Sequence, residues 1–339
     1  MNNAQKQIIL LIGLIIIAVG AWLYLFFASP AKEDLKEIIP KKAELTEIKI
    51  ADSAPLLTFI AIEKGFFKEE GLQVKSEKML PENGVSALLA GEVDYATFLG
   101  IYSGPAIEIG LRNAPIKTIM LTARYKESYV VTRPELEIND LKTIGILFQG
   151  ILFQLPLYYQ GLKFIEENDL ETEIITVETR QELQDLLQIG KADAILTAWG
   201  RAVRFQTQGF PILDIIVDEL PSYLTARNDK IEKNPEEVQK MIRTLEKTME
   251  FIVTEPEETK RLLLRYWELK ETKENLVMVE DYYPIIKTAY NRRGVPYDKG
   301  AKLLIQIAKA GEFETLQEVE EQVVTQEELD KVFDFRFVK

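Results

Sequence analysis

The chain has 339 residues, with 41 Lys and Arg against 54 Asp and Glu, and a formal net charge of −13. At about 150 residues per domain this length predicts two domains, with apolar residues enough for a substantial core. The acidic balance argues against nucleic acid as the main partner, because phosphate binding needs a basic face. Cys and His are both absent. This excludes disulfides, thiolate nucleophiles, lipid attachment through Cys, Ser-His pairs and the commonest zinc ligands.

The first predicted element is a membrane segment. Residues 8–27 are uncharged, with Trp22 and Tyr24 near one end, and as a helix they would span about 30 Å, the thickness of a bilayer core. Cleavage after Ala31, with Ser29 two residues before it, would instead make residues 1–31 a signal peptide. The apolar run exceeds the roughly 7–15 residues of a signal core, so we favour a retained single-pass transmembrane anchor. Under either alternative the body of the protein lies outside the cytoplasm, on a cell membrane if the anchor is retained.

A charged connector over residues 32–45, broken by Pro40, is predicted to hold the body away from the membrane. From Thr46 onward, short apolar strands alternate with helical stretches, which is typical of a mainly parallel α/β sheet. The first series comprises strands at 48–50, 72–78, 94–99 and 116–122 and helices at 55–64, 84–90 and 103–111.

The same alternation returns in a second series, with strands at 143–147, 173–177 and 193–197 and helices at 156–167 and 181–188. Two further strands are expected at 212–217 and 223–227, followed by an almost wholly helical block from Pro235 to Ala310 that supports one domain. The acidic tail, residues 312–339, is predicted to be a solvated surface with one short helix at 326–333.

Two segments of the chain echo each other. Ser86–Phe98 and Asp185–Thr197 each contain a helix end, a Gly, two residues, an Asp and an apolar strand. The glycines suit the left-handed conformation that ends a helix, and the two Asp residues suit turns before strands. The pattern indicates that each domain carries the same kind of unit, although many α/β proteins repeat this turn.

The segment GFFKEEGLQV, Gly65–Val74, resembles the solute-binding proteins of ABC importers for sulfonates, nitrate and thiamine precursors. This is the SsuA/THI5-like, or NMT1-like, family. The resemblance continues through LLAGEVDYATF, IKTIMLTA, SYVVTRPEL, INDLKTIGI and QIGKADAILTAW, and covers about Thr46 to Ala310.

The resemblance implies a periplasmic-binding-protein-like fold of type II, with two lobes that trap a ligand between them. Lobe one would comprise residues 46–127 and 218–311, and lobe two residues 128–217. The hinge crossings would lie near Ser128–Thr132 and Asp218–Tyr223. Ligands of open α/β sheets bind beyond the carboxyl ends of the strands, which agrees with a site between the lobes.

The resemblance also implies a set of ligand-binding residues in the loops at these strand ends. Tyr102 and Ser103 open a helix whose free N–H groups can bind an anion, Arg124 could bind it in a bidentate manner, and Trp199 would form a stacking wall. The remaining candidates are in the first loop and in the turn that opens lobe two: Ser53, Ala54, Gln149, Gly150 and Ile151.

Two departures from the family pattern affect the expected ligand. The turn opening lobe two is Phe148-Gln149-Gly150-Ile151-Leu152-Phe153, where many anion-binding members have Gly and Ser, and Gly200-Arg201 replaces the usual acidic residue and Pro after Trp199. A nitrate or sulfonate site fits these residues poorly. We expect a larger, partly apolar organic molecule with an anionic group.

The sequence shows no phosphate-binding or dinucleotide-binding glycine motif and no constellation for catalysis. We therefore expect no catalytic residue, no metal site and no cofactor. The predicted partners are the small-molecule ligand, the membrane and an ABC permease, with a membrane-bound sensor protein as the alternative to the permease. An enzyme on the same fold is the remaining alternative, disfavoured by the missing His and by export.

Overall fold

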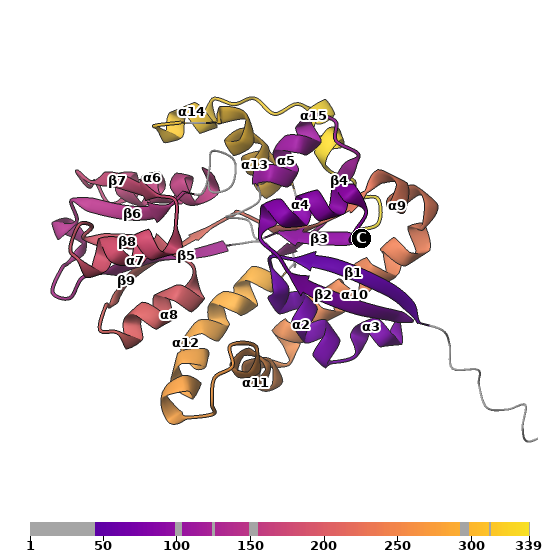
Figure 1. Ribbon diagram of the computed structural model, residues 1–339, viewed down its shortest axis with the longest axis horizontal. Coiled ribbons are helices and arrows are strands. Elements are labelled where there is room, and N and C mark those ends of the chain that lie inside the picture. The colour runs from indigo at the N-terminus through magenta and orange to yellow at the C-terminus, as the bar shows by residue number, and fades with distance from the viewer. Residues whose placement is uncertain are drawn as a thin grey trace, which may run out of the picture. The chain divides into compact units, whose positions relative to one another are not determined.

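The computed structural model describes residues 45–98, 104–123, 126–148, 155–291, 298–311 and 313–338. The predicted membrane segment at 8–27 and the connector at 32–44 lie outside these residues. Within the described ranges, no helix combines the length and the apolar character needed to cross a membrane. Residues 46–339 form one compact unit, which contains two five-stranded sheets (Figure 1).

The first sheet has the strand order β2-β1-β3-β10-β4. β1 pairs in parallel with both β2 and β3, whereas β10 runs antiparallel to β3 and β4. The strands are β1 (Thr46–Asp52), β2 (Leu72–Lys78), β3 (Tyr95–Phe98), β4 (Ile116–Ala123) and β10 (Ser222–Arg227). The chain therefore returns to its first sheet, through β10, after building the second.

The second sheet repeats this arrangement in the order β7-β6-β8-β5-β9. β6 pairs in parallel with β7 and β8, and β5 runs antiparallel to β8 and β9. The strands are β5 (Lys126–Thr132), β6 (Thr143–Leu147), β7 (Glu173–Val177), β8 (Ala194–Thr197) and β9 (Ile212–Asp218). The expected two-sheet α/β architecture is confirmed.

One expected hinge segment has a different role. Ser128–Thr132 lies inside β5 and is hydrogen-bonded to β8 on one side and β9 on the other, so it belongs to the second sheet and is not a crossing. Its apolar residues Tyr129, Val130 and Val131 are buried, which explains the strand. The return crossing follows Asp218, as expected, and reaches β10 at Ser222.

Helices cover both sheets. Those before β10 are α2 (Pro55–Glu63), α3 (Phe66–Glu69), α4 (Pro81–Ala90), α5 (Gly104–Leu111), α6 (Leu155–Glu167), α7 (Arg180–Gln188) and α8 (Trp199–Thr207). Those after it are α9 (Asn228–Lys233), α10 (Pro235–Thr254), α11 (Pro256–Tyr266), α12 (Lys273–Tyr290), α13 (Asp298–Ala310), α14 (Leu316–Glu320) and α15 (Gln326–Val332). The predicted helical block from Pro235 is thus present as α10 to α13.

The long helix α10 shows why this block is helical. Pro235 occupies the first turn, and Glu236 and Glu237 favour the positive end of the helix dipole. Its buried residues recur every three or four positions, as a helix packed on a core requires: Val238, Met241, Ile242, Leu245, Met249 and Ile252. α10 packs against α2, α3 and α12.

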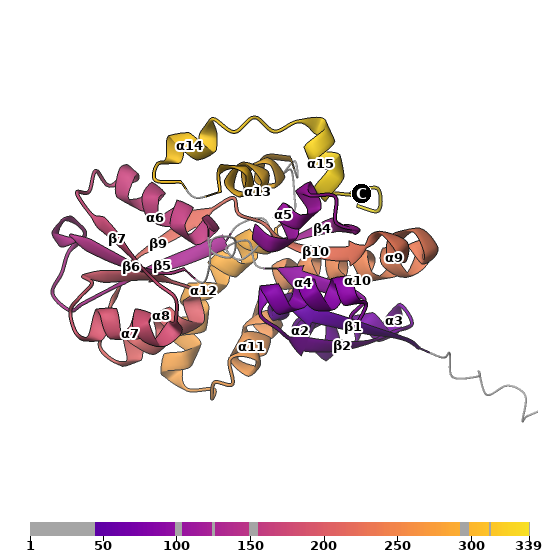
Figure 2. The ribbon, with the colours of Figure 1, turned by 45° about the horizontal axis from the view of Figure 1, so that its top comes forward.

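The C-terminal helices support both sheets and not one alone. α13 contacts α5 above the first sheet and α6 above the second, and α14 also contacts α6 (Figure 2). The tail holds an extra helix, α14, because Thr315 and Glu318 form a capping box. Val332 and Phe333 are buried, and the Asp334 amide donates to the Thr118 carbonyl at 2.8 Å. Val319, Val332 and Phe333 of the tail therefore belong to the core, whereas most of its acidic side chains, such as those of Glu320, Glu321 and Glu327, are exposed.

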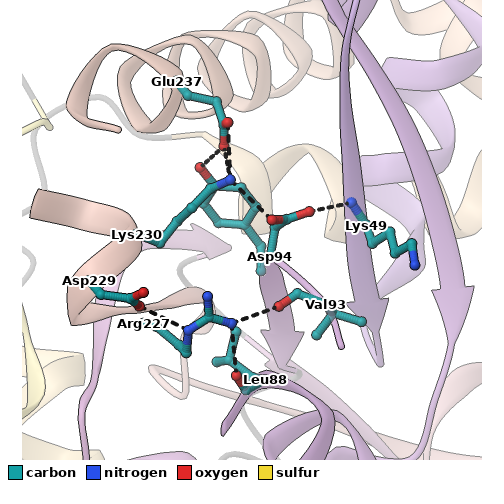
Figure 3. Close-up of polar contacts among 9 residues, drawn as sticks. Lys49, Leu88, Val93, Asp94, Arg227, Asp229, Lys230 and Glu237 are labelled. Atoms are coloured by element: carbon teal, nitrogen blue, oxygen red, sulfur yellow. Dashed lines mark hydrogen bonds and ion pairs between the residues drawn. The ribbon is translucent and has the colours of Figure 1, made fainter. Parts of the chain in front are cut away.

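The echo found in the sequence corresponds to one local structure in each sheet. Gly91 and Gly190 have φ angles of 76° and 74°, in the left-handed region that favours glycine. Asp94 accepts a hydrogen bond from the Lys49 amide of β1 at 2.9 Å (Figure 3). Asp193 accepts one from the Thr143 amide of β6 at 3.1 Å. Each Asp therefore fastens the start of one strand to its parallel neighbour, the turn role that the sequence predicts.

Candidate functional site

A cavity of about 250 Å³ opens where strands of both sheets end. The first sheet contributes the β1–α2 loop and the ends of β2 and β4, the second contributes β5 and the start of α8, and α11 and α12 close it. The lining residues are Ser53, Ala54, Pro55, Leu56, Lys78, Ala123, Glu127, Ala198, Trp199, Gly200, Ser222, Tyr266, Trp267, Tyr282, Ile286, Ala289 and Tyr290. Ligands of α/β sheets usually bind at such strand ends.

The β1–α2 loop is fixed by a hydrogen-bonded group around Asp52. Thr97 donates its hydroxyl to one carboxylate oxygen of Asp52, and Ser76 donates to the other at 2.9 Å. The Thr97 hydroxyl accepts from the Ala54 amide at 3.3 Å, and the Ser53 hydroxyl donates to the Thr97 carbonyl at 2.6 Å. Burial raises the pKa of Asp52, although the hydroxyl donors oppose this shift. These bonds hold Ser53 and Ala54 rigidly at the cavity wall.

The opposite wall is a stack of aromatic rings that joins the two sheets. Trp199, the first residue of α8, stacks on Trp267 with ring centroids 3.6 Å apart and an interplanar angle of 29°. Tyr282 of α12 lies 4.5 Å from the Trp199 ring and 5.2 Å from the Trp267 ring. Trp199 is only 7% exposed, because these rings cover most of it. A flat ligand would pack against the remaining ring edges and faces.

One buried carboxylate faces this aromatic group. Glu127 of β5 is 3% exposed and accepts a hydrogen bond from the Tyr282 hydroxyl at 2.6 Å. Burial, and then the negative charge of Glu127, raise the pKa of Tyr282 well above its ordinary value. Burial also raises the pKa values of Tyr266 and Tyr290. All three phenols are therefore neutral hydrogen-bond donors at physiological pH.

The structure brings three of the predicted site residues together: Ser53, Ala54 and Trp199 all line the cavity. Tyr102, Ser103, Arg124, Gln149, Gly150 and Ile151 lie outside the described residues. Ligand contact by any of these nine residues stays a prediction.

Sequence reasoning missed the residues that close the cavity from the C-terminal helices, namely Tyr266, Trp267, Tyr282 and Tyr290. Their signal was weak, since aromatic residues at helical spacing are usual in a core. It missed Glu127 as well, although a charged residue inside the apolar strand β5 is an unusual placement that can mark a site.

A metal centre has no support in the described part of the chain. No group of three or more acidic side chains there could hold a metal ion, and the sequence contains neither His nor Cys. The side chains around the cavity are suited to enclosing an organic molecule by aromatic packing and hydrogen bonding.

A family model described as NMT1/THI5-like matches residues 52–259 of the chain. No curated protein matches the sequence. The matched region includes every strand from β2 to β10, the cavity loops at Ser53 and Trp199, and the turns at Asp94 and Asp193, and it begins at the last residue of β1.

Solved structures with the same fold share little sequence with the chain. The ligand-binding component of an ABC-type import system from Staphylococcus aureus, with zinc bound, superposes with a TM-score of 0.65 at 12% identity, covering 86% of this chain and 97% of that one. The putative periplasmic sulfonate-binding protein SsuA from Methylobacillus flagellatus KT gives 0.62 at 16% identity, covering 87% and 93%. The desulfurization enzyme DSZB gives 0.58 at 14% identity, covering 86% and 97%. At these identities the likeness establishes the fold alone.

Proposed function

Since the chain belongs to the NMT1/THI5-like family, we propose that it is an extracytoplasmic solute-binding protein that delivers a small organic molecule to an ABC permease. The observation that carries this proposal is the cavity at the strand ends of both sheets. A ligand there would touch both sheets at once, so its binding would favour the closed arrangement. Solved structures of this fold include proteins named as ABC import components, which supports the same conclusion.

The cavity lining indicates the kind of ligand. Trp199, Trp267 and Tyr282 offer ring surfaces, which favour a flat or apolar body. Glu127 and the Ser53 hydroxyl offer polar atoms at the wall. We propose that Ser53, Ala54 and Trp199 contact the ligand, together with the loop residues Tyr102, Ser103, Arg124, Gln149, Gly150 and Ile151 assigned from sequence.

We also propose that residues 8–27 anchor the protein in the membrane, with 32–45 as the spacer. Lobe one would then comprise 46–127 and 218–311, lobe two 128–217, and residues 312–339 a tail. Membrane fractionation after a high-salt wash tests the anchor. Recovery of the full-length chain in the membrane fraction is expected. A soluble product that begins near Lys32 would instead indicate a cleaved signal peptide.

The test of solute binding is a thermal-shift screen of the purified full-length chain against aromatic carboxylates, sulfonates, pyrimidines and flavins. A ligand at 100 times its Kd stabilises the folded protein by about 2.7 kcal/mol. The same ligand should change the Trp fluorescence of the parent protein and of Trp22→Phe, the control. Trp199→Phe and Trp267→Phe should each reduce that change, and the double variant should lose most of it, because both rings line the cavity. A ligand signal of equal size in the double variant would remove the stacked pair from the site.

An enzyme is the second candidate, because one protein of the same fold is named a desulfurization enzyme. Turnover of small aromatic acids or sulfonates by the purified chain, without added cofactor, would favour it. Binding without turnover of the same compounds would favour the solute-binding protein.

A further inference from the structure

The chain beyond α13, residues 313–338, contacts elements of both sheets, and we call it the strap. Its first helix, α14, contacts α6, which covers the second sheet. Its second helix, α15, contacts α5 and β4 of the first sheet. Figure 2 shows the strap in yellow, running from α14 near α6 to α15 near α5. None of the described residues that line the aromatic cavity belongs to the strap, so it joins the two sheets outside that cavity.

The attachment of the strap to the second sheet is aromatic. The Phe313 ring lies against the Tyr158 ring of α6, with centroids 5.8 Å apart and an interplanar angle of 68°. Such an edge-to-face arrangement is favourable for aromatic rings. Phe313 is 5% exposed and Val319 of α14 is fully buried, and both belong to the apolar core that Tyr158 borders. The strap therefore holds α6 through buried apolar contacts.

The attachment of the strap to the first sheet consists of hydrogen bonds to its edge strand, β4. The Lys117 ammonium group donates to the carbonyls of Asp330 and Lys331, the second at 2.7 Å. Beside it, the Asp334 amide donates to the Thr118 carbonyl at 2.8 Å. These bonds hold α15 and the residues after it along β4.

Between its two attachments the strap is fastened to α13. The Lys309 ammonium group donates to the Val323 carbonyl at 2.6 Å and forms an ion pair with Glu328 at 2.7 Å. α13 in turn lies on the segment that returns from the second sheet to the first, since a Cβ built on Gly300 would be only 2.9 Å from the Pro221 Cδ. A rotation of one sheet about this return segment would move α5 relative to α6 and would strain both attachments.

We propose that the strap restricts the rotation of the second sheet relative to the first. A rotation must break the contact of Phe313 with Tyr158, break the hydrogen bonds of Lys117, or deform the strap between them. Arrangements that lack these contacts are disfavoured by the free energy that the contacts contribute. The restriction also affects binding, because a ligand that closes a molecule with fewer arrangements loses less conformational entropy. This consequence rests on the proposed function, whereas the restriction itself needs no ligand.

The experiment measures the distance between two spin labels on the purified full-length chain without ligand. The sequence contains no Cys, so Ser86→Cys on α4 and Glu166→Cys on α6, both at exposed positions, label the helices of the first and second sheets. In this labelled parent, Phe313→Ala removes the ring that holds α6. We expect the population of distances outside the parent's range to rise about tenfold, the upper scale of one aromatic pair. Lys117→Met, which releases the attachment to β4, should widen the distribution in the same way.

Phe210→Ala is the matched control, because the Phe210 ring packs on the Phe205 ring of α8 at 5.9 Å and both residues lie between β8 and β9 of the second sheet. It should lower the thermal stability as Phe313→Ala does and keep the parent's distances. Unchanged distances in folded Phe313→Ala and Lys117→Met would overturn the strap and leave the proposed solute binding untouched. Equal widening in Phe210→Ala would also overturn it, since any loss of core packing would then loosen the molecule. If Phe313→Ala does not fold, Lys117→Met decides by the same criteria.

Discussion

The two sheets of this protein have the same strand order but different surroundings. In each, a parallel set of three strands is extended by an antiparallel strand that also pairs with the edge strand. The first sheet carries the C-terminal helices α9 to α12 in addition to its own. The second has fewer covering helices, and its edge strand β9 exposes Ile215 and Val217. A common unit is therefore used twice, and the two copies differ in the helices that cover them.

The repeated unit extends to single residues. In the first sheet, Arg227 at the end of β10 donates to the carbonyls of Leu88 and Val93 beside the Gly91 turn (Figure 3). In the second, Arg133 after β5 binds Asp193 beside the Gly190 turn. Both arginines thus come from the antiparallel strand and hold the turn that precedes a parallel strand. This correspondence agrees with the expectation from the sequence echo that each half carries the same kind of unit.

The largest effect is expected where the two sheets meet. Trp199→Ala would remove a ring that stacks on Trp267 and is 7% exposed. We expect the free energy of unfolding to fall by about 3–4 kcal/mol, as for other buried Trp to Ala changes. Denaturant unfolding would measure it, with Trp199→Phe as the milder control. A loss below about 1 kcal/mol would mean that the stack contributes little to joining the sheets.

The next largest effect is expected from replacing Asp94 or Asp193, each of which accepts a hydrogen bond from the backbone of a neighbouring strand. In Asp193→Ala, the amides of Lys142 and Thr143 lose their acceptor and Arg133 loses its ion partner. In Asp94→Ala, the Lys49 amide loses its acceptor, and Lys230 loses one of its two carboxylate partners and keeps Glu237. Each change should cost about 2–3 kcal/mol in chemical denaturation, the scale of hydrogen bonds to a charged group. If only one of the two variants is destabilised, the two turns are not equivalent.

The two glycines of the repeated turn offer a finer comparison. Gly91→Ala and Gly190→Ala both place a Cβ on a left-handed residue, which costs about 1–2 kcal/mol. The new Cβ would lie 3.0 Å from the Arg227 Nη1 at position 91 and 3.4 Å from the Arg133 Nη1 at position 190. Thermal unfolding should therefore show a greater loss for Gly91→Ala. The reverse order would contradict the tighter packing of Arg227.

The smallest effect concerns pH. Burial alone would raise the pKa of Asp193, but the Lys142 amide, Arg133 and Thr143 donate to it and lower its pKa below the ordinary value. An Asp with a depressed pKa stabilises the fold above its unfolded pKa of about 3.9, and this contribution is lost as pH falls through the folded value. The free energy of unfolding should thus fall below about pH 4 less steeply in Asp193→Asn than in the parent. If the free energy of unfolding falls equally steeply with decreasing pH in the two proteins, Asp193 does not contribute to the loss of stability in acid.

The sequence by itself determined the repeated unit. Alternating short apolar strands and helices indicated two α/β series, and the Gly-x-x-Asp spacing before 95 and 194 marked the same turn in each. These features depend on residues close together in the chain, where backbone preference and local hydrogen bonding are decisive. For the same reason the strand boundaries at 72–78, 143–147 and 173–177 agree with the structure.

Only the tertiary structure decided which distant residues meet. Ser128–Thr132 is part of an inner strand of the second sheet because β8 and β9 both pair with it, and no local signal distinguishes that from a crossing. The cavity wall likewise joins Trp199 to Trp267 and Tyr282, and Glu127 to Tyr282, across 155 positions of sequence in the second case. From the sequence alone, aromatic residues on helices are interpreted as part of the core. The packing of α11 and α12 places these rings at the strand ends. The cavity therefore depends on burial and hydrogen bonding between segments distant in sequence, and no local sequence pattern encodes these contacts.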